Sequence, residues 1–333
     1  MSNILVTGGA GYVGSVCCAE LLRQGHAVTI VDDLSTGGRE AVVPGAAFFQ
    51  LDIGNQDALR LLVSNIRFDA VFHFAAKALI PESVTNPALF FQHNVASGIA
   101  MLDVLREADI RKFVFSSSAA VYGTPERIPI DEDDPKRPVN SYGETKLMFE
   151  RILHWYAQAY GWSVTAFRYF NACGATGDLG ERHDPETHII PLLLQTALGE
   201  RKTFNIYGDD YDTPDGTCLR DYVHVLDIAQ AHICALQQMN QPGMRAYNIG
   251  FGKSYSVQEV CRAVAEVTRQ TIPIRVTARR DGDAPVLCAS PKRIMRELKW
   301  RPQHSELHEI IESAWRWESR HSSPPIAMAY SAR

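Results

Sequence analysis

Short apolar segments alternate with segments of helical periodicity along the first half of the chain. Residues 3–7 are mostly apolar and predict a buried strand, whereas residues 15–24 carry Val16, Ala19 and Leu22 at helical spacing before Gly25. The same alternation predicts further strands at residues 27–31, 47–51, 70–74, 112–116 and 164–168, and further helices at residues 55–66, 86–108 and 141–160. Since strand–helix–strand units cross over with a right hand, the pattern predicts an α/β fold with a doubly wound parallel sheet between two layers of helices.

A glycine-rich turn follows the first predicted strand. Gly8 would allow a sharp turn, Gly11 would let the backbone approach a pyrophosphate, and Gly14 would let the next helix pack closely on its strand. The free N–H groups at the start of that helix could then bind the phosphates. A turn in this context, between a strand and a helix, predicts a Rossmann-type dinucleotide site.

Asp32 ends the second predicted strand, eighteen residues after Gly14. A carboxylate at this point can accept hydrogen bonds from the ribose hydroxyls of adenosine and would repel a 2′-phosphate, so the pattern favours NAD over NADP. The neighbouring Asp33 leaves open which acid has this role, and two aspartates in a polar turn are the alternative without function.

The regular alternation weakens after Arg168, and Gly, Pro, His and acidic residues fill residues 174–187. We therefore expect a Rossmann-type NAD-binding domain in residues 1–173, with about 221–250 packing back on it, and a smaller α/β substrate lobe in residues 174–320. Further helices are expected near residues 189–199, 226–238, 257–269, 291–298 and 307–318. Residues 321–333 mix Ser, Pro and Ala without a period, which predicts a loose C-terminal tail.

Composition narrows the class of protein. The chain has 333 residues, is 46% hydrophobic and carries a net charge of −5, which favours a soluble enzyme and argues against a nucleic-acid partner. Its seven cysteines have neither zinc spacing nor a disulfide framework, as expected in a reducing cytoplasm. We find no signal peptide and no apolar run of membrane-spanning length, so we expect no membrane partner. His183 and His188, with Asp184 and Glu186 between them, match no standard ligand spacing, and we expect no metal.

Tyr142 and Lys146 lie four residues apart on a predicted helix, so their side chains share one face. Tyrosine, with a usual pKa of about 10, is a poor base at neutral pH, but a nearby ammonium and the positive nicotinamide of bound NAD would favour the phenolate. The phenolate could then accept a proton from a substrate hydroxyl whose carbon gives hydride to NAD. Ser118, just after a predicted strand, is expected to hold the substrate oxygen and to share its proton with Tyr142. A surface helix pair and a serine-rich strand end are the alternatives without function.

The chain from Asn3 to about Arg320 resembles the extended short-chain dehydrogenase/reductases, and within them the 4-epimerases of UDP-sugars. The resemblance rests on the segments TGGAGYVG, HFAA, SSSAAVYG, YGETK, RYFNACGA and RDYVHVLD. It implies that Tyr142 and Lys146 serve both cofactor and chemistry and that Tyr169 closes over the nicotinamide. The other residues that it implies for NAD are Gly8, Gly11, Tyr12, Val13, Gly14, Asp32, Asp52, Ile53, Phe74, Ala75, Ala76 and Asn94.

The same resemblance implies a nucleotide-sugar site and a reaction. Its expected residues, besides Ser118 and Tyr142, are Asn171, Ile189, Tyr207, Arg220, Tyr222, Arg280 and Leu287. Related dehydratases and decarboxylases carry an acid just after the active-site hydroxyl, where this chain has Ala119 and Ala120. The resemblance therefore implies interconversion of UDP-glucose and UDP-galactose through a 4-keto sugar with no net redox.

Several alternatives stay open at this stage. Another UDP-sugar, such as UDP-N-acetylglucosamine, UDP-xylose or UDP-glucuronate, would leave the same motifs in place, and Leu287 leaves the acceptance of N-acetyl sugars open. A non-catalytic, NAD-sensing regulatory protein could have the same fold. The resemblance also implies a homodimer through a four-helix bundle of the helices at residues 86–108 and 141–160.

Overall fold

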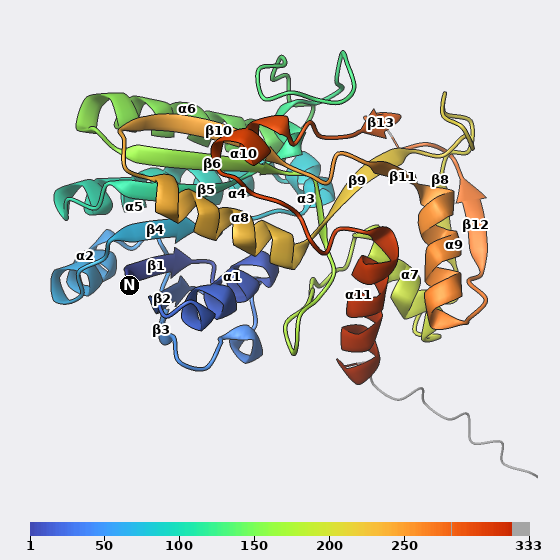
Figure 1. Ribbon diagram of the computed structural model, residues 1–333, viewed down its shortest axis with the longest axis horizontal. Coiled ribbons are helices and arrows are strands. Elements are labelled where there is room, and N and C mark those ends of the chain that lie inside the picture. The colour runs from blue at the N-terminus through green and yellow to red at the C-terminus, as the bar shows by residue number, and fades with distance from the viewer. Residues whose placement is uncertain (281, 322–333) are drawn as a thin grey trace, which may run out of the picture.

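The computed structural model describes residues 1–280 and 282–321. The tail expected at residues 321–333 lies outside this part of the chain, except for His321, which ends the last helix. The described residues form a large sheet with helices on both faces and a smaller lobe beside it (Figure 1).

The large sheet has seven strands in the order β10-β6-β5-β4-β1-β2-β3. All neighbouring strands are parallel, so their carboxyl ends meet at one edge. The order reverses direction between β1 and β4, and ligands of such sheets bind at this crevice. The strands are β1 (Asn3–Thr7), β2 (Ala27–Asp32), β3 (Ala47–Gln50), β4 (Ala70–His73), β5 (Lys112–Ser118), β6 (Ser163–Tyr169) and β10 (Gly243–Ile249).

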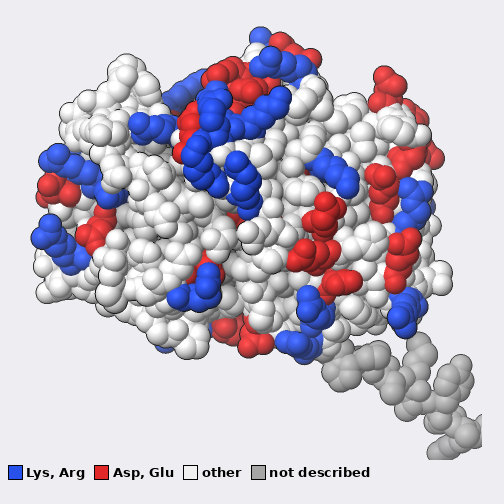
Figure 2. Space-filling view, in the orientation of Figure 1, with Lys and Arg blue, Asp and Glu red and all other residues white. Residues whose placement is uncertain are grey.

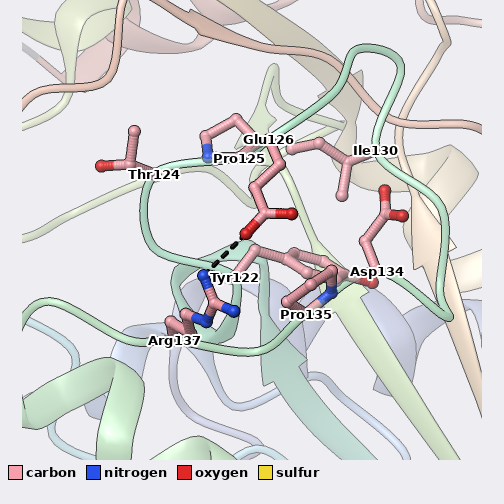
Figure 3. A pocket seen from close by; sticks show the side chains of 8 residues that line it. All are labelled: Tyr122, Thr124, Pro125, Glu126, Ile130, Asp134, Pro135 and Arg137. Carbon is pink, nitrogen blue, oxygen red and sulfur yellow. Dashed lines mark hydrogen bonds and ion pairs between the residues drawn. The ribbon is translucent and has the colours of Figure 1, made fainter.

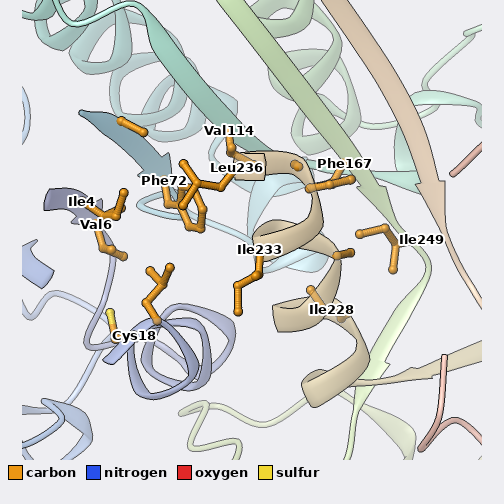
Figure 4. Packing of buried hydrophobic residues seen from close by; sticks show 14 of the residues in the cluster. Ile4, Val6, Cys18, Phe72, Val114, Phe167, Ile228, Ile233, Leu236 and Ile249 are labelled. Atoms are coloured by element: carbon orange, nitrogen blue, oxygen red, sulfur yellow. The ribbon is translucent and has the colours of Figure 1, made fainter. Parts of the chain in front are cut away.

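Alternate side chains of each strand pack into two different cores. In β1, Ile4 and Val6 face helices α1 (Tyr12–Arg23) and α8 (Val225–Gln238), as Figure 4 shows. Leu5 faces the opposite core, formed with α2 (Gln56–Asn65), α5 (Ser97–Glu107) and α6 (Ser141–Tyr160). Because side chains of a strand alternate between its faces, apolar residues at every position require this burial on both sides. The predicted doubly wound α/β fold is confirmed.

The segment predicted as one helix over residues 86–108 is divided into three parts. A short helix α4 (Pro87–Phe91) passes into a π-helical segment η2 (Gln92–Ala96) and then into α5. The wider turn contains Asn94, whose side chain is buried and bonded to a neighbouring loop. By length and composition alone the run Pro87–Glu107 could cross a membrane, but half of its most apolar window is buried inside the protein, as in the core helices of folded domains.

The smaller lobe is built around β9 (Leu219–His224). This strand pairs with β7 (Asn171–Cys173), β11 (Ser254–Ser256) and β13 (Val286–Leu287), while β8 (Phe204–Tyr207) pairs with β12 (Ile274–Thr277). The helices α7 (Ile189–Ala197), α9 (Val257–Thr268) and α11 (Leu307–His321) enclose its apolar core. A capping box between Ser256 and Glu259 fixes the start of α9.

Two late segments lie against the large sheet rather than in this lobe. They are α8 with β10, and α10 (Lys292–Glu297), which packs beside β10 through Ile294. The remaining short elements are α3 (Ile80–Thr85), η1 (Arg39–Ala41) and η3 (Ala119–Val121).

Acidic and basic side chains are interspersed on the face seen in Figure 2. Many of them are paired, for example Arg293 with Asp133 and Arg296 with Glu297. The largest group of basic side chains on this face lies near the top of the view, with acidic side chains beside it (Figure 2).

Candidate active site

A cleft of about 630 Å³ runs along the carboxyl edge of the large sheet, between this edge and the smaller lobe. The segments that follow β1, β2, β4, β5 and β6 form one wall. Most of the residues predicted for cofactor and substrate line this cleft, namely Gly8, Gly11, Tyr12, Val13, Gly14, Asp32, Asp52, Ile53, Phe74, Ala75, Ala76, Ser118, Tyr142, Lys146, Tyr169, Asn171, Arg220, Arg280 and Leu287.

Three of the four glycines in the first turn, Gly8, Gly11 and Gly14, have different roles. Gly8 has φ +74°, and a Cβ there would lie 2.4 Å from the backbone nitrogen of Ala75, while a Cβ on Gly14 would lie 2.1 Å from the carbonyl oxygen of Gly8. A Cβ on Gly11 would meet only the carbonyl oxygen of Gly8, at 3.3 Å. Gly11 faces the cleft, so its missing side chain leaves space for a ligand rather than for the protein itself. This space, next to the start of α1, fits the pyrophosphate of a dinucleotide.

The carboxylate of Asp32 is buried at the end of β2 and is held by two backbone N–H groups. Oδ2 accepts a hydrogen bond from Ala10 at 2.9 Å, and Oδ1 accepts one from Leu34 at 2.9 Å. Burial raises the pKa of this carboxyl group, and the two hydrogen bonds partly offset the effect. Asp33 instead binds the N–H of Ser35 on a more exposed loop. The geometry therefore favours Asp32 as the acid that would meet the adenosine ribose.

Asn94 does not line the cleft, in contrast to the expectation. Its Oδ1 accepts from the N–H of Lys77 at 2.8 Å, and its Nδ2 donates to the carbonyl oxygen of Lys77 and to the hydroxyl of Thr145. The protein itself uses both donors of the amide, because the π-helical turn directs this side chain behind the loop after β4. Asn94 thus holds the loop that contains Phe74, Ala75 and Ala76 against helix α6.

Ser118, Tyr142 and Lys146 come together at the centre of the cleft. The α6 helix begins at Asn140, whose side chain accepts from the N–H of Gly143, and it presents Tyr142 and Lys146 one turn apart. Ser118 ends β5, accepts from the N–H of Ala120 at 3.1 Å and lies close enough to the phenol of Tyr142 to lower its pKa. The Nζ of Lys146 lies 5.7 Å from the centre of the Tyr142 ring.

Burial governs the protonation of this group. It raises the pKa of Tyr142, and the hydrogen bond from Ser118 lowers it only in part. Burial also lowers the pKa of Lys146 to about 7, against the opposing effect of Glu150. We expected the ammonium of Lys146 to lower the pKa of Tyr142. In the protein without NAD, however, desolvation has the larger effect on this pKa. The Nζ of Lys146 instead donates to the carbonyl oxygen of Ser116 at 2.8 Å.

A buried polar network beneath these residues was not predicted from the sequence. Glu150 and Arg168 form an ion pair at 2.7 Å with both side chains only 5% exposed, and Glu150 also accepts from the hydroxyl of Ser117. Arg168 also donates to the hydroxyl of Tyr122 at 2.8 Å. The network joins β5, α6 and β6 below the cleft. Its sequence signal is slight, since Glu150 follows Lys146 by one helical turn and Arg168 is the only charged residue of β6.

The smaller lobe contributes two arginines to the cleft. Arg220 is 14% exposed and donates to the carbonyl oxygen of Ala284 at 2.8 Å, which fixes its guanidinium. The guanidinium carbon of Arg280 lies 3.6 Å from the centre of the Tyr207 ring, so Tyr207 supports Arg280 rather than lining the cleft itself. Asn171 lies in β7, next to β9, and donates to the backbone oxygen of Asp221.

Tyr222 and Ile189 do not reach the cleft either. Tyr222 is 1% exposed within the core of the smaller lobe, and its hydroxyl has no hydrogen-bond partner among the described residues. Ile189, at the start of α7, packs against the same core. Both residues belong to elements whose neighbours line the site, which explains why a motif match includes them.

A second, much smaller pocket lies in the loop after Tyr122 (Figure 3). Its wall includes the ion pair of Arg137 with Glu126 at 2.6 Å, together with Pro125 and Ile130. Its space of about 10 Å³ is close to that of one water molecule, so it cannot hold a nucleotide.

Comparisons with known proteins agree with this architecture. Residues 4–250 match the family model described as "NAD dependent epimerase/dehydratase family". A protein of Corynebacterium glutamicum named UDP-glucose 4-epimerase is 46% identical over 317 residues, which span 95% of this chain and 96% of the relative.

Solved structures are similar over the same length. UDP-glucose 4-epimerase from Brucella ovis, in complex with NAD, has a TM-score of 0.92 and 42% identity over 95% of this chain and 98% of its own. The enzyme from Bifidobacterium longum, in complex with NAD⁺ and UDP, has a TM-score of 0.91 and 32% identity over 96% and 99%. With its glycine turn, Asp32 and the Tyr142–Lys146 pair at one sheet edge, the chain belongs to the NAD-dependent epimerase/dehydratase family, among the extended short-chain dehydrogenase/reductases.

Proposed function

We propose that the protein is a UDP-glucose 4-epimerase that uses NAD to interconvert UDP-glucose and UDP-galactose. The observation that carries this proposal is that Ser118, Tyr142 and Lys146 line one cleft, whose adjoining wall is formed by Ala119 and Ala120. A hydroxyl and a phenol can handle one proton, and the two positions after Ser118 carry alanine where elimination or decarboxylation would need an acid. The relatives named above carry the same name for their activity.

Residues of the large sheet would hold the cofactor. Gly11 leaves room for the pyrophosphate, the first turn of α1 offers N–H groups, and Asp32 can accept from the ribose. When bound there, NAD supplies a reversible hydride acceptor, which permits epimerisation without net redox.

The chain's own groups would manage the proton and the orientation of the substrate. Ser118 holds the 4-hydroxyl oxygen, and the phenolate of Tyr142 removes its proton and returns one to the inverted alkoxide. Lys146 keeps Tyr142 and the strand end in register through its hydrogen bond to Ser116. Arg220 and Arg280 bind the diphosphate as forked donors, so that the nucleotide stays fixed while the 4-keto sugar turns its other face.

We also propose that two copies pair through α4–α5 and α6. Trp155 on α6 is 67% exposed, and Phe91 and Ile99 are also exposed on the neighbouring helical run. Exposed aromatic and aliphatic groups of this kind are typical of interfaces. Light scattering should give twice the chain mass, and Trp155→Glu should shift the measured mass toward that of the monomer.

A cytoplasmic location stays a prediction. This location agrees with the seven free cysteines among the described residues.

Product analysis tests the activity directly. Pure protein is incubated with UDP-galactose, and the nucleotide sugars are separated by ion-pair chromatography. We expect UDP-glucose to accumulate to equilibrium, with no net NADH formed. UDP-N-acetylglucosamine, UDP-xylose and UDP-glucuronate are assayed in parallel, because Leu287 borders the cleft without fixing the sugar. Conversion of one of these alone would change the assigned sugar, and NAD binding without any conversion would favour a sensing role.

A further inference from the structure

Four potential metal ligands meet in the loop that joins the two lobes. Glu181, His183, Glu186 and His188 each offer a donor atom, and these atoms all lie within 4.8 Å of one another. The loop between β7 and α7 has no regular secondary structure over these residues, so no helical or strand period could predict this convergence. The spacing of the two histidines alone predicted no metal, because the contribution of Glu181 was not visible in the sequence.

Two buried polar atoms at the centre of this cluster have close neighbours but form no hydrogen bond with the described residues. The side chain of Glu181 is 6% exposed, and its Oε1 lies 2.8 Å from Nδ1 of His183 and 2.5 Å from Nδ1 of His188. Neither contact has the geometry of a hydrogen bond, and both Oε1 of Glu181 and Nδ1 of His183 are buried without a hydrogen-bond partner among the described residues. Both atoms lie at the centre of the cluster, where a bound cation would give each of them a partner.

We propose that these four side chains bind one divalent transition-metal cation, with Zn²⁺ as the preferred ion. Two imidazole nitrogens and two carboxylates form a borderline ligand set that suits zinc, and two carboxylates balance its charge. Zinc bonds of about 2.0–2.1 Å place tetrahedral ligand atoms about 3.3 Å apart. Nδ1 of His188 and Oε1 of Glu186 are 3.4 Å apart, whereas the two shorter contacts to Glu181 would open by less than 1 Å on binding.

Neighbouring groups already orient the ligands. Oε1 of Glu186 accepts from the backbone N–H groups of Thr187 and His188, which fixes the direction of this carboxylate. Such outer contacts are usual in metal sites, where they fix the direction of each ligand. The two imidazole rings lie 5.3 Å apart between their centres, close enough to share one ion.

The location of the site indicates a structural role. Glu181, His183 and His188 border the cleft, and His188 directly precedes α7. The same loop is tied to the large sheet, because Tyr12 donates to the carbonyl oxygen of Gly174 and Arg182 pairs with Glu40 at 3.0 Å. A cation here would fix the second lobe relative to the cofactor turn, without taking part in proton or hydride transfer.

Metal content tests the proposal without any nucleotide sugar. Full-length protein, with every affinity tag removed, is incubated with excess Zn²⁺, desalted and analysed by mass spectrometry of the elements. We expect about one zinc per chain, and a loss of about tenfold or more in bound zinc for Glu181→Gln and for His183→Ala. The control is His308→Ala, because His308 is 61% exposed and pairs with Glu266 away from the cluster. That variant should keep its zinc.

A variant at an exposed ligand and the melting temperature provide two further tests of the zinc site. His188→Ala changes a side chain that is 51% exposed, so it should fold, which circular dichroism checks, and should also lose zinc. The wild-type melting temperature should rise with Zn²⁺ but not in the Glu181→Gln variant. Wild-type protein that retains no zinc after desalting, or folded cluster variants that retain it fully, would overturn the site. A protein inactive as an epimerase but loaded with zinc would leave the site standing.

Discussion

At the scale of single residues, the pKa of Tyr142 is the quantity on which the proposed chemistry depends. Burial raises this pKa, and Ser118 is the neighbour whose hydrogen bond lowers it. The ring also packs edge-on against Phe90, with 6.5 Å between the ring centres. The ring of Tyr142 therefore sets the position of this side chain, whereas proton transfer depends only on its hydroxyl group.

Removing this hydroxyl should separate the two roles. We expect Tyr142→Phe to lower kcat with UDP-galactose by about 10²–10⁴-fold while the NAD content stays unchanged, because the phenyl ring keeps its packing but has no acid–base group. Tyr160→Phe is the matched control, since Tyr160 lies at the far end of α6 and is 44% exposed. Turnover that is equal in the two variants would exclude Tyr142 as the base.

The sequence predicted which residues belong to the site better than it predicted where their side chains point. The spacing of Tyr142 and Lys146 fixed their shared face, because a helix repeats every 3.6 residues. The burial of Tyr222 and the inward turn of Asn94 depend on tertiary neighbours that a motif does not contain. For the same reason the Glu150–Arg168 pair was missed, since two charged residues far apart in sequence are usually exposed.

At the scale of elements, the first βα turn is the feature most closely determined by sequence. Gly8 and Gly14 are required by the chain itself, while Gly11 has backbone angles of −87° and 174°, which any residue can adopt. The turn thus combines two positions that serve folding with one that serves a ligand.

This difference predicts two distinct phenotypes. We expect Gly11→Ala to change the free energy of unfolding by less than about 1 kcal/mol but to weaken NAD binding about tenfold or more, because its methyl group enters the ligand space. Gly14→Ala should instead destabilise the fold by about 2 kcal/mol or more, since its Cβ overlaps a backbone oxygen. Urea unfolding and calorimetric titration with NAD measure both quantities. Similar losses of stability in the two variants would refute this division.

The ion pair between Glu150 of α6 and Arg168 of β6 predicts how strongly these two elements stabilise each other. Glu150→Gln leaves the guanidinium of Arg168 buried without its counter-charge, so we expect a loss of about 3–5 kcal/mol in the free energy of unfolding. Glu107→Gln is the control, because Glu107 pairs with Arg60 at an exposed site and should cost less than about 1 kcal/mol. Equal effects in urea unfolding would mean that the buried pair is not structurally important.

Element boundaries followed the sequence where local signals exist. The α6 helix runs over residues 141–160 as predicted, between the Asn140 cap and Gly161, whose φ is +68°. The run at 86–108 has helical periodicity throughout, so nothing in its apolar pattern could indicate the π-helical turn at Asn94. The side chain in that turn instead bonds to Lys77, which lies in a different segment.

At the scale of the whole molecule, three histidines are buried in neutral form in different parts of the fold. Burial lowers the pKa of His73 and of His224 to about 3 each and that of His232 to about 4. In the unfolded chain these groups titrate near 6.5, so below that pH the unfolded state binds more protons than the folded state. Stability from these residues is complete above pH 6.5 and is lost as the pH falls toward 4.

Acid should therefore unfold the protein before most carboxylates titrate. We expect the free energy of unfolding to fall between pH 6.5 and 4.5, and the fall to be less steep in His232→Gln. Asp221 acts in the opposite direction, because burial raises its pKa to about 6, so the comparison with the variant is needed. Urea unfolding at several pH values measures the slope. Parallel curves for wild type and variant would show that His232 does not contribute.

The arrangement of the two lobes could be predicted only in part. Alternating apolar segments specify a parallel sheet, because each strand must be buried on both faces. The position of α10 beside β10 and the cluster around Glu181 arise from irregular segments, whose paths no periodic pattern encodes.

The chain leaves the large sheet after β6 and returns to it with α8 and β10, and this detour has a consequence for synthesis on the ribosome. Ile4, Val6 and Phe72 emerge early, but the side chains that cover them, Ile228 and Ile233, are made more than 150 residues later (Figure 4). Until then α1 covers only part of this face of the nascent sheet, and the unfinished chain exposes an apolar surface of the kind that chaperones bind. The insertion that provides the substrate lobe therefore delays the burial of the domain that was made first.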